Sequence, residues 1–255
     1  MRRLALLVVL LGVVGCGAPT PLSAPLPTTS ASQGVMASAS AAPSARRGAT
    51  DDDVATYATE ILERAAATEP DVTPRLVTVA EQMGGAMVKL EHKLKTRAST
   101  ERKLRAKMAE DGVSLRDVVI DDALRYTMKV DDEPPGRHVE AIGAVLDALS
   151  QTGHEVVRLK NYWPAGDNYS GINGVFRAPN GLLWELQFHT PASIRVQAET
   201  RAMYEELRKV DTAPARKREL FEAMTAAWDE VPIPEGILVP GALHDKAEII
   251  DRPSP

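Results

Sequence analysis

The clearest pattern along the chain lies in residues 181–190, where hydrophobic and polar positions alternate from residue 184 to residue 189. An alternation with a period of two predicts a β-strand, because successive side chains of a strand point to opposite faces of a sheet. The two faces carry Trp184, Leu186 and Phe188 on the apolar side and Glu185, Gln187 and His189 on the polar side. We therefore expect one face to pack in the core and the other to be available for chemistry.

Similar patterns place further elements along the chain. Strands are predicted over residues 124–130, 155–162 and 171–177, and residues 178–181 predict a hairpin turn before the strand described above. Apolar residues at helical spacing predict helices over residues 51–68 and 73–90, one capped by Ser99, and others over residues 138–150, 192–210 and 213–231. This order predicts an α+β domain with a mixed β-sheet of about four to five strands flanked by helices.

The start of the chain predicts a lipoprotein signal peptide over residues 1–15. Two arginines precede an apolar stretch that is short for a membrane span. Cys16, the single cysteine, follows Val13-Val14-Gly15, which resembles a bacterial lipobox, so we expect lipidation of Cys16. A cleaved signal with an incidental cysteine is the alternative. The predicted location is the bacterial cell envelope, at the outer membrane where the cell has one; a start at Met36 would instead give a cytoplasmic protein.

Composition separates the remaining chain into three parts. Residues 16–50 consist almost entirely of small residues and proline, which predicts a disordered tether. Residues 51–231 have the length of one globular domain, and residues 232–255 form a C-terminal extension. The net charge of -5 gives no reason to expect general nucleic-acid binding, although basic residues concentrate between Lys89 and Lys107. No glycine-rich phosphate loop or zinc motif is visible.

Five segments in order along the chain carry a resemblance to a known family. They are residues 93–104, 121–127, 160–173, 185–190 and 199–205. They resemble the synthetase domain of the RelA/SpoT family, the nucleotide pyrophosphokinases that make alarmones, and most closely its small single-domain and toxin branch. The resemblance implies a nucleotidyltransferase-like RelA/SpoT synthetase fold that transfers pyrophosphate from ATP to the 3′-hydroxyl of a nucleotide or of a tRNA end, in an enzyme or a toxin-type effector.

The first two segments correspond to the ATP and metal site of that family. The residues that would approach the ATP phosphates are Lys93, Lys95, Ser99 and Lys103. Cations and a helix N-terminus stabilise the charge that builds on phosphate oxygens during transfer. Lys93 stands in place of an arginine of the family and lacks its bidentate fork. The second segment implies that Asp122 binds Mg²⁺, with Asp121 as the fallback ligand, because magnesium requires hard carboxylate oxygens beside the phosphates.

The later segments correspond to the acceptor and to the catalytic strand. The resemblance implies that the acceptor base, of GDP, GTP or an adenine nucleotide, stacks on Tyr169. Asn173 replaces the usual histidine and leaves the acceptor open, while His189 stands for an arginine and either contacts phosphate or supports the site. Glu185 would act as general base on the 3′-hydroxyl, as second metal ligand or as both. Gln187 would orient the acceptor.

The same residues leave a second interpretation open. A catalytically degenerate lipoprotein with this fold would bind a nucleotide or a partner without turnover. The substitutions at Lys93, Ser170 and Asn173 favour that interpretation, whereas Asp122 and Glu185 favour an enzyme. The expected partners are therefore nucleotides, a tRNA end, and the membrane through Cys16. The sequence predicts no oligomeric state.

Overall fold

The computed structural model describes residues 49–164, 168–209 and 211–250. The predicted signal peptide, Cys16 and nearly all of the predicted tether lie outside the described residues. The described helices are α1 (Asp51–Gln82), α2 (Arg97–Asp111), α3 (Arg137–Ser150), α4 (Pro191–Leu207) and α5 (Pro214–Asp229), with 3₁₀ turns η1 (Leu90–His92) and η2 (Leu115–Asp117). The strands are β1 (Ala86–Val88), β2 (Arg125–Lys129), β3 (Glu155–Asn161), β4 (Ile172–Arg177), β5 (Leu183–His189) and β6 (Ala247–Ile249).

The strands form one mixed sheet in the order β1-β2-β5-β4-β3-β6. The pairs β2–β5 and β3–β6 are parallel, and the other three pairs are antiparallel. The expected α+β class and mixed sheet are confirmed, with the long β-hairpin of β4 and β5 beside β2. The sheet has two strands that the pattern did not predict, β1 and β6, because three residues are too short to display an alternation.

Helix α1 corrects the expectation of two separate N-terminal helices. It runs without a break for 32 residues, although Pro70 and Pro74 lie inside it. Each proline removes one backbone hydrogen bond, but a continuous apolar stripe is buried along the whole helix and compensates for that loss. The helix begins with a capping box between Thr50 and Asp53. It ends at Gln82, before a Gly-Gly turn, so residues 86–88 form strand β1 instead of continuing the helix.

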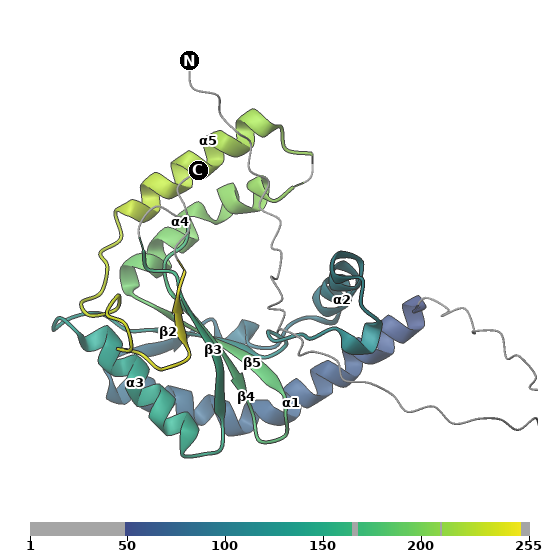
Figure 1. The fold of residues 1–255 in the computed structure, drawn as a ribbon, viewed down its shortest axis with the longest axis horizontal. Coiled ribbons are helices and arrows are strands. Elements are labelled where there is room, and N and C mark those ends of the chain that lie inside the picture. Colours follow the sequence, from purple (N-terminus) through teal and green to yellow (C-terminus); the bar gives the residue numbers. More distant parts are fainter. Residues whose placement is uncertain (1–48, 165–167, 210, 251–255) are drawn as a thin grey trace, which may run out of the picture. The chain divides into compact units, whose positions relative to one another are not determined.

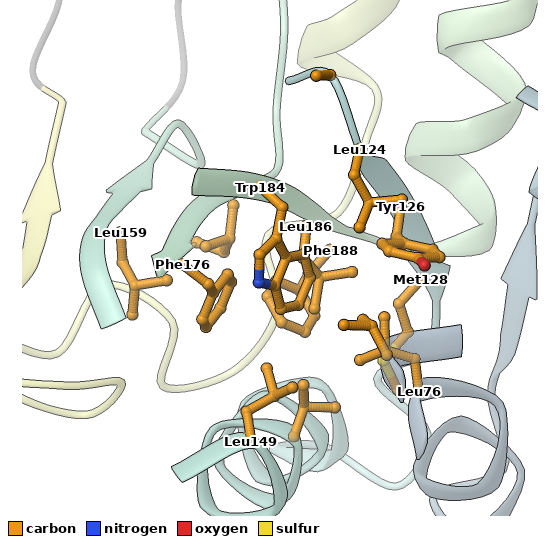
Figure 2. Close-up of a cluster of buried hydrophobic side chains, with 14 of the residues drawn as sticks. Leu76, Leu124, Tyr126, Met128, Leu149, Leu159, Phe176, Trp184, Leu186 and Phe188 are labelled. Carbon is orange, nitrogen blue, oxygen red and sulfur yellow. The ribbon is translucent and has the colours of Figure 1, made fainter. Parts of the chain in front are cut away.

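The apolar face of the sheet packs on α1 and α3 (Figure 1). Figure 2 shows Trp184 and Phe188 of β5 between Phe176 of β4 and Met128 of β2, above leucines of the two helices. The rings of Trp184 and Phe176 are stacked with centroids 4.8 Å apart. All three apolar residues of the alternating strand are fully buried, which confirms the expected core face.

The second layer consists of α4 and α5, which pack against each other after β5 (Figure 1). Thr190 caps α4 through a capping box with Ser193, one residue after the end of β5. None of the helices in the described part of the chain has the length and apolar character needed to cross a membrane.

The C-terminal extension contributes to the sheet. Its strand β6 pairs in parallel with β3, and Ile237 is buried in the core. The buried Asn161 side chain donates a 2.8 Å hydrogen bond to the Ile237 carbonyl, and Asp132 accepts a 2.7 Å hydrogen bond from the Glu235 backbone N–H. The extension is therefore attached by one buried and one exposed polar contact as well as by strand pairing.

We predict that Phe176→Ala destabilises the domain strongly. The substitution removes a fully buried ring stacked on Trp184, and large-to-small changes of this kind cost about 3–5 kcal/mol because they leave a cavity. Urea unfolding followed by circular dichroism measures the change. The matched control is Tyr204→Ala, since Tyr204 is 47% exposed on α4. Equal effects of the two substitutions would contradict the assigned core.

Candidate active site

Strand register aligns polar side chains on the sheet face opposite α1 and α3. One row of paired residues runs across β2, β5, β4 and β3 and contains Arg125, Glu185, Val175 and Arg158. The next row on this face contains Thr127, Gln187, Asn173 and Lys160. Paired residues of neighbouring strands share a face. The sheet therefore brings together residues from three of the predicted segments, and helices α2 and α4 lie on either side of this face (Figure 1).

A carboxylate and two lysines form the first cluster on this face. The Lys95 ammonium donates a 2.6 Å hydrogen bond to Asp122 Oδ2, and Lys103 of α2 donates a 2.8 Å hydrogen bond to Asp122 Oδ1. A backbone bridge between Leu94 and Leu124 places Lys95 beside Asp122. Three residues that the sequence predicts for the ATP and metal site thus meet in one ion-pair network.

The charges in this cluster stabilise one another. The Asp122 and Lys95 side chains are only 14% and 13% exposed. Burial alone would raise the pKa of Asp122, but Lys103 and Lys95 outweigh burial and hold the pKa below its usual value. Burial alone would lower the pKa of Lys103, but Asp122 and then Asp121 raise it. Asp122 and Lys103 therefore stay ionised at neutral pH.

Glu185 has the opposite electrostatic environment. Burial, followed by the negative charges of Asp122 and Asp121, raises the pKa of the Glu185 carboxyl. Gln187 donates a 2.7 Å hydrogen bond to Glu185 Oε1 and fixes the orientation of the carboxyl group. A carboxylate with a raised pKa accepts a proton more readily, which is the property required of a general base.

Tyr169, Asn173 and His189, all predicted for the acceptor, form a second cluster. The Tyr169 hydroxyl donates a 2.7 Å hydrogen bond to Asn173 Oδ1 and lies 3.1 Å from His189 Nε2. The Tyr169 ring also packs against the rings of Tyr162 and Trp228, with centroids 5.5 and 5.7 Å away. The hydroxyl group and the ring of Tyr169 are therefore both held by neighbouring side chains.

The structure distinguishes the two roles that the sequence left open for His189. Its side chain is 0% exposed, and burial, followed by the charge of Lys89, lowers its pKa to about 3. Its Nδ1 lies 3.0 Å from Ser193 Oγ at the start of α4. A buried neutral imidazole between Tyr169 and Ser193 is suited to support and not to cationic contact with a phosphate.

Two predicted phosphate-binding residues lie apart from the first cluster. Lys93 Nζ is 3.6 Å from Glu69 of α1. Ser99 is not the N-cap of α2, which corrects the sequence prediction: Thr96 has the extended cap conformation, and its hydroxyl accepts from the Ser99 backbone N–H. Ser99 Oγ accepts a hydrogen bond from Arg102 at 3.2 Å. Their predicted contacts with ATP stay predictions.

Arg158 is a site residue that the sequence analysis missed. Its guanidinium donates a 3.2 Å hydrogen bond to Asp121 Oδ2, so it joins the first cluster from β3. The alternation of Arg158 and Lys160 within a predicted strand indicated a shared polar face. Only the pairing of β3 with β4 places Lys160 next to Asn173, one strand away from β5.

The carboxylate oxygens of Asp122 and Glu185 are of the type that binds magnesium. Carboxylates are the ligands that Mg²⁺ prefers, and the Glu185 backbone N–H donates a 3.0 Å hydrogen bond to the carbonyl of Leu124, two residues after Asp122. No group of three or more acidic, histidine or cysteine side chains that could hold a metal occurs within the described ranges, but magnesium beside nucleotide phosphates needs only one or two protein carboxylates. Both Asp122 oxygens carry ammonium partners, so metal binding there requires a lysine to move.

A hollow of about 360 Å³ lies on the α1 side of Lys95. It is lined by α1 and by residues 94, 95 and 97. Asp122, Glu185 and Tyr169 do not line it, so this hollow is separate from the polar sheet face.

We predict that Glu185→Gln stabilises the protein at neutral pH. The raised pKa of Glu185 means that the folded state favours the protonated carboxyl, so its contribution to stability is present at acidic pH and is lost as the pH rises through the folded-state pKa. The variant should therefore unfold at a higher temperature than the wild type at pH 7.5, and the difference should shrink towards pH 4. Thermal unfolding across this pH range measures the effect.

The control for this measurement is Glu222→Gln, because Glu222 is exposed on α5. A stabilisation that persists unchanged at pH 4, or one that the control reproduces, would contradict the electrostatic assignment of Glu185.

Comparisons with known proteins concern the fold. No protein-family profile matches the chain, and no curated protein sequence matches it. Similar solved structures include the type VI effector Tas1 in complex with its immunity protein, at 18% identity and a TM-score of 0.45 over 68% of this chain and 95% of that one. The small alarmone synthetase 1 from Bacillus subtilis has 15% identity and a TM-score of 0.47 over 68% and 92%. A GTP pyrophosphokinase family protein from Streptococcus pneumoniae has 15% identity and a TM-score of 0.44 over 69% and 88%.

Proposed function

We propose that this protein is an ATP-dependent nucleotide 3′-pyrophosphokinase. Its acceptor is the 3′-hydroxyl of a guanine or adenine nucleotide, or of a tRNA end. The observation that carries the proposal is the raised pKa of the Glu185 carboxyl group beside the network that Asp122 forms with Lys95 and Lys103. The resemblance of the sequence segments to RelA/SpoT synthetases supports the same reaction.

The two lysines of the first cluster are assigned to the donor phosphates. Pyrophosphoryl transfer builds negative charge on non-bridging oxygens, and fixed cations stabilise that charge in the transition state. Lys95 and Lys103 have their ammonium groups at Asp122 and can exchange this carboxylate for a phosphate oxygen. Magnesium, held by Asp122 and Glu185, would supply further neutralisation of the phosphate charge.

Glu185 is assigned to the proton of the acceptor. Its carboxylate accepts the 3′-hydroxyl proton while the 3′ oxygen forms a bond to the β-phosphorus of ATP. The bond between that phosphorus and the oxygen bridging to the α-phosphate breaks, and AMP leaves with the electron pair. Gln187 holds Glu185 Oε1 by its 2.7 Å hydrogen bond and so maintains the direction of proton transfer.

Tyr169 is assigned to the acceptor base. Stacking on an aromatic ring provides binding energy with little discrimination among bases. The hydroxyl contacts with Asn173 and His189 fix the ring orientation and reduce the conformational entropy lost on binding. This arrangement supports a nucleotide acceptor and leaves the choice between guanine and adenine to other contacts.

One observation favours a second function, nucleotide binding without turnover. Both oxygens of Asp122 are engaged by ammonium groups, and Lys93 is paired with Glu69 of α1. A protein in which these ion pairs persist would bind a nucleotide on the polar face without completing a donor site. The two functions differ in one measurable property, which is the transfer of label from ATP.

We predict that Glu185→Gln lowers pyrophosphate transfer by about 10²–10⁴-fold, the typical contribution of a general base. The full chain is incubated in detergent with γ-labelled ATP, magnesium and GDP, GTP, ADP or tRNA, and labelled products are separated by chromatography. Glu222→Gln is the control and should retain wild-type transfer. Nucleotide binding by calorimetry should change little in Glu185→Gln.

Two results would contradict this assignment. Unchanged transfer in Glu185→Gln would remove Glu185 from catalysis. Measurable nucleotide binding by the wild type without transfer to any acceptor would favour the binding function.

We further propose that Cys16 is lipidated and anchors the protein in the cell envelope. The envelope holds no standing pool of ATP, so the proposed reaction includes delivery into a cytoplasm, either of the producing cell or of a competitor in the manner of a toxin. A start at Met36 is the alternative and would give an unanchored cytoplasmic enzyme.

The anchor predicts that expressed wild-type protein incorporates radiolabelled palmitate and partitions with membranes. Cys16→Ser should abolish the label, because no other cysteine is present. Ser23→Ala is the control within the predicted tether and should keep the label. An unlabelled wild-type protein that remains soluble would contradict the anchor.

A further inference from the structure

The C-terminal extension connects two of the rings that pack against Tyr169. It begins after α5, where the Val231 backbone N–H donates a 3.0 Å hydrogen bond to the Trp228 carbonyl. It reaches β6 (yellow in Figure 1), which pairs with the last residues of β3, directly before Tyr162. The rings of Trp228 and Tyr162 both contact the Tyr169 ring. The extension is therefore joined at its start and at β6 to groups that hold this tyrosine.

Asn161 is the junction between the extension and β3. It is 1% exposed, and its side chain donates a 2.8 Å hydrogen bond to the Ile237 carbonyl and accepts a 3.0 Å hydrogen bond from the Trp163 backbone N–H. Its own carbonyl accepts a 2.8 Å hydrogen bond from the Ile250 backbone N–H. Breaking one of these bonds would leave a polar group buried without a partner, so the amide fixes the end of β3 relative to the extension.

From Asn161 the contacts reach Tyr169 through one residue. The Tyr162 backbone N–H donates a 2.9 Å hydrogen bond to the Gly171 carbonyl. The Tyr162 ring meets the Tyr169 ring edge to face, with centroids 5.5 Å apart. A displacement of the end of β3 would therefore be transmitted to the tyrosine that is assigned to the acceptor base.

Strand β6 also extends the polar sheet face. Glu248 is paired with Lys160, and Lys160 is paired with Asn173 of the acceptor cluster. Paired residues of neighbouring strands share a face, so the exposed Glu248 lies on the same face as Asn173. The extension thus borders the acceptor cluster through the sheet as well as through Asn161.

Asp132 holds the first part of the extension. Its Oδ2 accepts the 2.7 Å hydrogen bond from the Glu235 backbone N–H, and its Oδ1 accepts hydrogen bonds from the backbone N–H groups of Gly136 and His138 at 3.0 and 3.1 Å. Gly236, the next residue of the extension, has a φ of 77°, a left-handed conformation that glycine adopts without strain. One carboxylate therefore joins the extension to the start of α3.

We propose that the C-terminal extension positions Tyr169 for the acceptor, with Asn161 and Asp132 as positioning residues. This inference rests on the proposed function. A ring that is already held in place loses less conformational entropy when a base stacks on it. The apparent affinity falls with the fraction of molecules in which the ring is correctly placed. Loss of either anchor should therefore weaken acceptor binding and leave the groups assigned to ATP and to the proton in place.

Hydrogen–deuterium exchange on the full chain in detergent tests this coupling without a nucleotide. The variant is Asp132→Asn. The N–H groups at the start of α3 should retain the amide oxygen, so the amide NH₂ group would face the Glu235 N–H and the extension would lose this bond. We expect exchange to become about tenfold faster in residues 232–250 and also in residues 168–173. Residues 178–183, in the turn between β4 and β5, should exchange as in the wild type.

Two asparagine variants form a matched pair for calorimetry with GDP. Asn161→Ala removes both side-chain hydrogen bonds described above. Asn180 forms bonds of the same two types at the turn between β4 and β5, because it donates to Thr68 Oγ1 at 2.8 Å and accepts from the Leu182 backbone N–H at 3.0 Å. GDP should bind about tenfold more weakly to Asn161→Ala and Asp132→Asn, whereas Asn180→Ala should bind as the wild type. Asp132→Asn alone decides the result if Asn161→Ala does not fold.

Two results would overturn the proposal. Faster exchange that is confined to residues 232–250, with residues 168–173 unchanged, would mean that the extension is attached without influence on Tyr169. A loss of GDP affinity that Asn180→Ala reproduces would mean that reduced stability, and not the position of the ring, weakens binding.

Transfer assays separate this inference from the proposed function. If both are correct, Asp132→Asn should raise the KM for the acceptor nucleotide about tenfold, with the KM for ATP and kcat nearly unchanged. Coupled exchange and weakened GDP binding in a protein that transfers no label would retain the positioning role and remove the enzymatic function. Transfer by the wild type, with uncoupled exchange and an unchanged acceptor KM in Asp132→Asn, would do the reverse.

Discussion

The structure depends on strand β5, which lies inside the sheet and buries one apolar face in the core. This strand has neighbours on both sides, β2 and β4, and its residues Trp184, Leu186 and Phe188 fill the core over α1 and α3. A shift of one residue in its register would place these side chains on the polar face and Glu185 in the core. Burial of the apolar face therefore determines where the catalytic candidates lie, and the register with β2 and β4 determines their neighbours.

Charge compensation differs between the two sides of Glu185. On the side of α2, Asp122 accepts from two lysines, and Asp121 accepts from Lys103 and Arg158. On the side of α4, the Lys89 ammonium donates to the Gln197 amide oxygen, and Arg195 of α4 forms an ion pair with Glu199. The compensated cluster of Asp122 with Lys95 and Lys103 is stable without a ligand but must rearrange to bind one.

The sequence predicted the acceptor cluster better than it predicted the role of each member. Tyr169, Asn173 and His189 are spread over 21 residues of sequence, yet they share hydrogen bonds in the structure. Burial of His189 removes its charge and makes it a support for Tyr169. The degree of burial depends on Gly171, where an added Cβ would lie 2.8 Å from His189 Cε1, a contact that no sequence pattern displays.

Local sequence determined the strands β2 to β5, the helices from α2 onwards to within a few residues, and the polar face of β5, because periodicity and turn residues are local properties. It did not reveal the continuity of α1 through two prolines or the edge strands β1 and β6, since tertiary packing stabilises them. Tertiary structure alone decided that Asp122 meets Lys95 and Lys103, that Lys93 turns to Glu69, and that Lys89 meets Gln197 of α4. These contacts join residues far apart in the chain, so their charges interact only after the sheet has formed.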